Sequence, residues 1–238
     1  MTKMLTRTLY ALIFGLFSLT ITTPANADFA APQSWNRGDV NTTYQHWDFF
    51  DSYPTDSTPD VGNINPSGTA SLTETTGTAL PLGSGNIYGA ASAAQFVVTI
   101  PEQDIPSYDL TALVQIKVGG TELDVSSLAL NSLAPVKHNE LSRVEIPGRG
   151  ATVEHQFLFQ VSYANYGDGV GPDVTDLTLN FGAVEAMLSL DQVSIDTAIQ
   201  PSGFFPERIP EPSSALLGLL AGAGVLLRRR NLLLGAVG

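Results

Sequence analysis

The chain has 238 residues, with 11 basic against 23 acidic side chains, and it contains no cysteine. The lack of cysteine excludes a disulfide framework and a thiolate metal site. Residues 28–209 hold six basic and 22 acidic residues, a net charge of −16. This charge argues against nucleic acid as a partner, because phosphate binding needs the opposite sign.

The first 27 residues have the three parts of a secretory signal peptide. Two basic residues precede an apolar stretch over residues 9–21, and a small-x-small tripeptide ends at Ala27. The pattern predicts export through the Sec translocon and cleavage by signal peptidase between Ala27 and Asp28. An uncleaved anchor or a buried core helix is the alternative interpretation of the same apolar stretch.

A group of aromatic residues follows in residues 44–53, with Trp35 nearby. Flat rings can stack on sugar rings, which makes Tyr44 and Trp47 candidates for glycan binding. Strand alternation places Trp47 on one face and Tyr44 on the other, so about half of the group is expected in a core. A sugar platform and buried packing therefore both remain open.

Residues 28–200 are predicted to form one all-β domain. Residues 152–163 alternate between apolar and polar side chains, which indicates a half-buried strand. Residues 182–190 are compatible with one or two helical turns. Many short strands without intervening helices predict an antiparallel β-sandwich. The same period of two recurs at Phe96/Val98/Ile100, at Ala112/Val114/Ile116/Val118, at Leu123/Val125 and at Leu177/Leu179/Phe181.

The last predicted strand contains a change of phase. Leu188 and Leu190 share one face, whereas Val193 and Ile195 continue with the opposite parity. This predicts a β-bulge near residues 191–192 that returns the apolar side chains to the core. Residues 188–196 also resemble the closing strand of extracellular jelly-roll domains, which implies a jelly-roll-like sandwich.

Two loops are rich in oxygen ligands, one over residues 48–65 and one over residues 165–176. In the second loop Asp168, Asp173 and Asp176 are candidate ligands of a structural calcium ion, which needs about six to eight oxygen atoms. Neither loop has EF-hand spacing. Ordinary turn chemistry explains Asp and Asn beside Gly equally well, so both interpretations remain. No other cofactor is expected.

The three histidines do not form a known catalytic motif. The sequence contains neither H-E-x-x-H nor G-x-S-x-G. His155 lies on the apolar face of its predicted strand, where a hydrogen-bonded core histidine is expected. We therefore predict a protein that is not an enzyme. A secreted hydrolase with paired carboxylates remains an alternative, because such a pair becomes visible only in the fold.

The C-terminus is predicted to direct sorting. Residues 201–209 form an expected extended linker, and residues 215–227 form an apolar run of nearly membrane length that predicts a transmembrane sorting helix. Basic residues remain on the cytoplasmic side of a membrane, so the charges before the first apolar run and after the second place the domain outside. The sorting segment covers residues 210–238 and contains Pro210, Glu211 and Pro212 before the apolar run and Arg228, Arg229 and Arg230 after it.

These residues resemble the PEP-CTERM sorting signal of exopolysaccharide-producing Gram-negative bacteria. The resemblance implies an exosortase, a membrane transpeptidase, as partner, with residues 210–212 as its substrate motif and residues 228–230 as the cytoplasmic stop. It also implies an inner-membrane intermediate before delivery to the cell surface or extracellular matrix. The expected role in biofilm is structural or adhesive. The alternative is a carbohydrate-binding module that recognises matrix polysaccharide.

Overall fold

The computed structural model describes residues 29–167 and 173–203. The chain divides into two compact units, Met1–Ala30 and Ala31–Gly238, and only Phe29 and Ala30 of the first unit are described. The predicted signal peptide with its Ala27/Asp28 cleavage site and the whole sorting segment, residues 210–238, lie outside the described residues. Within residues 29–167 and 173–203, no helix is long and apolar enough to cross a membrane.

The larger sheet, called sheet A, has seven strands in the order β4-β5-β12-β7-β10-β9, and β1 also pairs with β12. Every pairing in this sheet is antiparallel. Its strands are β1 (Thr42–Trp47), β4 (Leu80–Pro81), β5 (Ile87–Gly89), β7 (Tyr108–Gly120), β9 (Lys137–Ile146), β10 (Gly150–Val161) and β12 (Leu188–Pro201).

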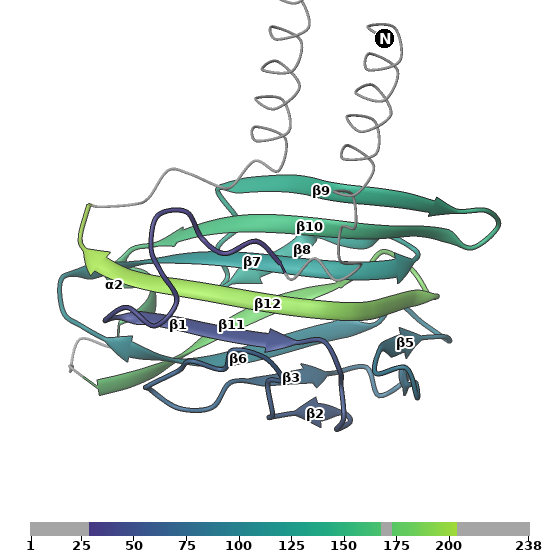
Figure 1. Cartoon of the computed structure of the whole chain (residues 1–238), viewed down its shortest axis with the longest axis horizontal. Helices are drawn as coiled ribbons and strands as arrows, with labels where there is room; N and C mark the ends of the chain where they lie inside the picture. The colour runs from purple at the N-terminus through teal and green to yellow at the C-terminus, as the bar shows by residue number, and fades with distance from the viewer. Residues whose placement is uncertain (1–28, 168–172, 204–238) are drawn as a thin grey trace, which may run out of the picture. The chain divides into compact units, whose positions relative to one another are not determined.

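The second sheet, called sheet B, has five antiparallel strands in the order β2-β3-β6-β11-β8. Figure 1 shows β9, β10, β7 and β12 side by side, with strands of sheet B behind them. The strands of sheet B are β2 (Thr55–Asp56), β3 (Ser71–Glu74), β6 (Gln95–Asp104), β8 (Leu123–Leu130) and β11 (Asp173–Ala183).

The inward faces of both sheets share one hydrophobic core. Phe96 and Phe181 of sheet B stack with ring centroids 5.1 Å apart. Val114 and Ile116 of β7 are fully buried in the same cluster. The predicted strands around residues 96–100, 112–118, 123–125, 152–163 and 177–181 are thereby confirmed. The described part of the chain is an all-β, sandwich-like domain, because each sheet buries one apolar face against the other.

The predicted bulge in β12 is confirmed. The pairing of β12 with β7 shifts register between Leu190 and Gln192, which leaves Asp191 as the extra residue. Beyond the bulge Val193 again faces inward opposite Ile116. On its other edge β12 pairs with β5 up to Leu190 and with β1 from Val193 onward. The bulge therefore lies where one partner strand ends and the next begins.

Two features differ from the sequence-based expectation. The helical turn expected over residues 182–190 is wrong, because β11 continues to Ala183 and β12 begins at Leu188. Strand β9 was not predicted. It lies at the edge of sheet A and most of its residues are exposed, so it has no apolar alternation to detect. A four-residue helix, α2 (Tyr163–Tyr166), follows β10.

Candidate functional site

The outer face of sheet A, which points away from sheet B, is hollowed around a strand glycine. Residues Tyr88, Ser189, Gly119 and Thr152 stand opposite one another on β5, β12, β7 and β10, and so form one row across the sheet. Gly119 in the middle of the row has no side chain. Its neighbours are polar or aromatic, so the gap is bordered by groups that can form hydrogen bonds.

Two adjoining hollows occupy this region, and together they are called the polar groove. The larger has a volume of about 630 Å³ and the smaller about 310 Å³, and both are lined by Asn86 and Asp191. The larger is also lined by Tyr88, Gly119, Gly120, Ile146, Gly148, Arg149, Thr152, Met187 and Ser189. The smaller is also lined by Asp48, Ser84, Lys117 and Gln192.

The topology explains why these side chains meet. The bulge places Asp191 on the outer face, where its Oδ2 lies 3.6 Å from the position that a Cβ of residue 119 would occupy. Asp48 follows the last residue of β1, and Asn86 precedes the first residue of β5. Because β1 and β5 end on either side of the bulge, both residues reach the carboxylate of Asp191 or its surroundings.

A chain of hydrogen bonds fixes the floor of the polar groove. The hydroxyl of Ser84 donates to Asn86, whose side-chain amide donates to the hydroxyl of Ser189. Ser189 in turn donates to Asp191 Oδ1 at 2.8 Å, and the amide of Asn86 lies 3.4 Å from the same oxygen. Burial raises the pKa of the Asp191 carboxyl, while these bonds and Lys117 act in the opposite direction. The four side chains are thus held in one arrangement.

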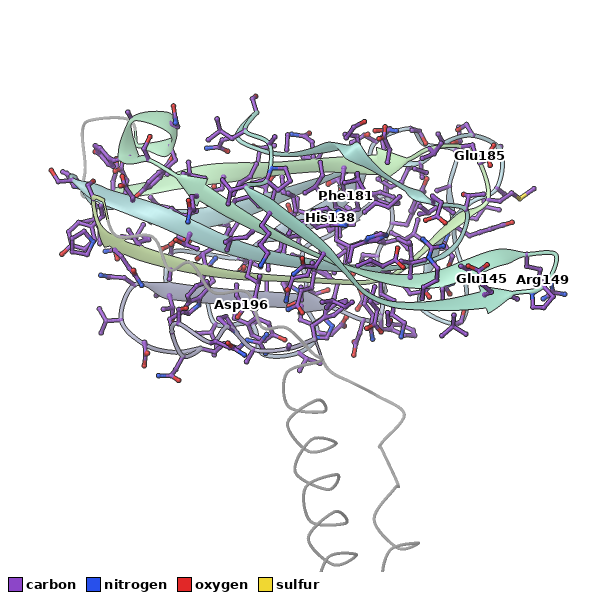
Figure 2. All side chains as sticks on the ribbon, turned by 90° about the horizontal axis from the view of Figure 1, so that it is seen from above. His138, Glu145, Arg149, Phe181, Glu185 and Asp196 are labelled. Carbon is purple, nitrogen blue, oxygen red and sulfur yellow. The ribbon has the colours of Figure 1, made fainter. Side chains whose placement is uncertain are left out.

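The charges that line the polar groove balance. Lys117 and Arg149 are the cations of its lining, and Asp48 and Asp191 are the carboxylates. Lys117 also lies 3.7 Å from Glu154. Figure 2 shows Arg149 at the tip of the β9–β10 hairpin, where its exposed side chain borders the larger hollow. This mixture of donors and acceptors suits a ligand that both donates and accepts hydrogen bonds.

The aromatic candidates for glycan binding are both buried. Trp47 is fully buried in the core and Tyr44 is only 4% exposed. Tyr44 lies on the outer face of β1, but Arg37 covers its ring at 3.5 Å and its backbone pairs with Ile64. In this arrangement neither ring can stack on a sugar. Buried packing, the other interpretation, is what the structure contains.

The structure does not bring the described calcium candidates together. Asp173 and Asp176 both belong to β11, and residues three apart along a strand point to opposite faces. Asp168 lies outside the described residues. Within residues 29–167 and 173–203, no group of three acidic or histidine side chains is arranged to hold a metal ion. In the first oxygen-rich loop Asp60 accepts the backbone N–H groups of Asp48 and Phe49, which is ordinary turn chemistry.

The expectation for His155 is confirmed, and it has a partner that the sequence did not reveal. His155 is 3% exposed, and its Nδ1 lies 3.1 Å from Nε2 of the exposed His138. Burial, with a further contribution from His138, lowers the pKa of His155 to about 4. His155 is therefore neutral at physiological pH and serves the packing beside Phe157.

Comparisons with family models, with curated proteins and with solved structures gave no match for this chain. The class is therefore defined by the described residues alone. It is an all-β, sandwich-like protein with a preorganised polar groove on the outer face of one sheet. The sequence did not reveal the groove, because a Gly-Gly pair after an apolar alternation, as at residues 119–120, is typical of a turn. The available signal was a glycine on the outward face of β7, in phase with Gln115 and Lys117, since a glycine within a strand often leaves room for an approaching group.

Proposed function

We propose that this chain is an exported, non-enzymatic protein of the cell envelope or the exopolysaccharide matrix, where it has a structural or adhesive role. The main support for the proposal is the sequence pattern in residues 1–27 and 210–230. A complete signal-peptide pattern precedes residue 28, and the motif at residues 210–212 precedes an apolar run and an arginine cluster. In this proposal an exosortase processes the protein at the inner membrane.

The domain between these ends is compatible with this proposal. It folds around an apolar core without any cysteine, and its net charge of −16 favours solubility among other macromolecules. We further propose a jelly-roll-like arrangement of the sandwich. The pairing of β1, the opening strand of sheet A, with β12, the closing strand, supports this finer assignment.

The proposal is tested at the carboxyl end of the protein. Intact-mass spectrometry would be carried out on the protein purified from its host and from a strain that lacks the exosortase. We expect a C-terminus near residues 210–212 in the parent strain and a chain that keeps its tail in the exosortase-deficient strain. An intact Gly238 in both strains would overturn processing, and recovery of the domain from the cytoplasm would overturn export.

A further inference from the structure

We propose that the polar groove binds a neutral polysaccharide chain, with Asp191, Asn86 and Ser189 as the central hydrogen-bonding groups. This inference uses the proposed function only to name the source of the polymer, the surrounding matrix. The site itself follows from the described residues. It contains neither Tyr44, whose ring Arg37 covers elsewhere on the outer face of sheet A, nor Trp47, which lies in the core.

The shape of the polar groove fits a chain better than a single small molecule. Its hollows of about 630 and 310 Å³ each lie within the range of about 300–1,000 Å³ that is usual for ligand sites. Asn86 and Asp191 line both hollows, so a ligand that extends past these two residues contacts both. Such a series of subsites around shared polar residues is what an extended polymer requires.

The lining matches the chemistry of sugar hydroxyls, which both donate and accept hydrogen bonds. Asp191 offers carboxylate oxygens, Asn86 and Ser189 offer the oxygen lone pairs that their mutual hydrogen bonds leave over, and Lys117 and Arg149 offer donors. Both hydrogen bonds of Asp191 within the described residues fall on Oδ1, and Oδ2 faces the space above Gly119. Because the floor is already hydrogen-bonded, a ligand meets groups that need little further ordering.

The groove also offers apolar surface beside these polar groups. The larger hollow is bordered by Ile146 and Met187 and by the half-buried ring of Tyr88. Sugar rings present C–H faces next to their hydroxyls, and an apolar or aromatic wall suits those faces. A lining of this mixed kind favours a sugar over a purely apolar ligand, which would leave Oδ2 of Asp191 without water or a partner.

The charges in and around the polar groove favour a neutral polymer over an anionic one. Two cations and two carboxylates line the groove, so the site has no excess charge to attract an ion. The surrounding region, residues 28–209, has a net charge of −16 and repels a polyanion at long range. An acidic polysaccharide would therefore be repelled during approach without finding a compensating cluster of cations in the groove.

Gly119 offers a substitution that narrows the larger hollow and is expected to leave the fold intact. A Cβ at this position meets Asp191 Oδ2 at 3.6 Å and Ser189 Cβ at 3.8 Å, which is ordinary van der Waals contact. Gly119→Val adds a side chain that strands favour and places it over the free side of the carboxylate. Ser142→Val is the matched control. Ser142 is an exposed residue on the same outer face, in β9, and lines neither hollow.

The experiment is native affinity electrophoresis of the processed protein purified from its host. Gels would contain dextran, glucomannan, mixed-linkage β-glucan or the neutral fraction of the host's own exopolysaccharide, with alginate as the anionic probe. We expect retardation by at least one neutral polymer. The apparent dissociation constant should rise about tenfold or more in Gly119→Val and remain unchanged in Ser142→Val. Thermal unfolding of each variant checks that the domain is folded.

Three outcomes would overturn the inference: no retardation by any neutral polymer, retardation by alginate alone, or equal retardation of Gly119→Val and the wild type. Asp191→Asn provides a second variant of nearly the same shape, and unchanged binding there would remove Asp191 from the site. C-terminal mass is measured on the same preparation. A processed protein that fails to bind overturns the groove assignment alone, whereas an unprocessed protein that binds overturns the sorting proposal alone.

Discussion

The outer face of sheet A has a covered half and an open half, although the same strands form both. Residues 31–41 cross the covered half, where Trp35 packs on Leu113 and Leu158. In the open half the corresponding position of β7 is Gly119, and the polar groove lies above it. Two leucines in adjacent strands create apolar surface that the chain covers, whereas glycine among polar neighbours leaves a hollow. The residue types along each row therefore decide where the face is covered.

The largest effect is expected from breaking the ion pair that anchors the covering segment. Asp196 has a fully buried side chain, and the guanidinium of Arg37 contacts its two oxygens at 2.6 and 2.8 Å. Arg37→Leu leaves a buried carboxylate without its cation, so we expect the free energy of unfolding to fall by about 3 kcal/mol in urea denaturation.

Two further variants test whether this loss of stability comes from the ion pair. Arg149→Leu removes an exposed arginine from the open half and should change the free energy of unfolding by less than about 0.5 kcal/mol. The double variant Arg37→Leu/Asp196→Leu should regain part of the loss, because it removes both charges. Equal losses for the two arginines would mean that the ion pair does not anchor the segment.

The inner face of sheet B contains the carboxylate of Glu102, whose hydrogen-bond partners among the described residues are uncharged. Glu102 of β6 is 1% exposed and accepts the hydroxyl of Thr197 at 2.5 Å. Burial raises its pKa from 4.5 to about 7, so the folded state holds a proton that the unfolded chain releases. The stability present below pH 4.5 is therefore lost as the pH rises through 7, by about 3 kcal/mol.

Glu102→Gln removes this titration. As the pH rises from 4.5 to 7, the wild type should lose this stability and the variant should not. The free energy of unfolding of the variant should therefore increase relative to that of the wild type. His155 acts with the opposite sign, because its lowered pKa makes stability fall as the pH drops from 6.5 through about 4. Since both proteins contain His155, its contribution cancels in the difference. A difference that is independent of pH would show that Glu102 does not hold the proton.

A smaller effect is expected from uncovering the apolar patch on the outer face. Trp35→Ala exposes Leu113 and Leu158, which are now 2% and 4% exposed. Because the indole is itself half-exposed, we expect a loss of about 1–2 kcal/mol in the free energy of unfolding. Trp35→Phe should retain most of the covering surface. Equal losses for both variants would indicate that burial of the leucines is not the cause.

The smallest effect on the free energy of unfolding is expected from a substitution of Gly119 in the open half. The same substitution at the adjacent Gly120 serves as a comparison. Gly119→Ala should change stability by less than about 1 kcal/mol, because its Cβ has room. Gly120 has φ of +85°, and a Cβ there would lie 2.2 Å from the carbonyl oxygen of Met187. We expect Gly120→Ala to cost about 1–3 kcal/mol more than Gly119→Ala in the same denaturation assay. Similar losses would contradict the proposed open space at Gly119.

Sequence alternation predicted β6, β7, β8, β10, β11 and β12, because each has an apolar face. The phase change between Leu190 and Val193 was enough to predict the bulge. Strand β9 could not be predicted in this way, since solvent contacts both of its faces. The groove depends on Asp48, Asn86 and Asp191, which meet only because β1 and β5 end beside the bulge of β12. Such a meeting of distant residues follows from strand order, which no local pattern contains.

The bulge in β12 also allows the outer surface of sheet A to change without a change in the core sequence. Without Asp191, the residues Leu188, Leu190, Val193 and Ile195 would follow an unbroken inward alternation. Loss of this single residue would therefore alter the outer surface beside Gly119 and leave the interior sequence as it is.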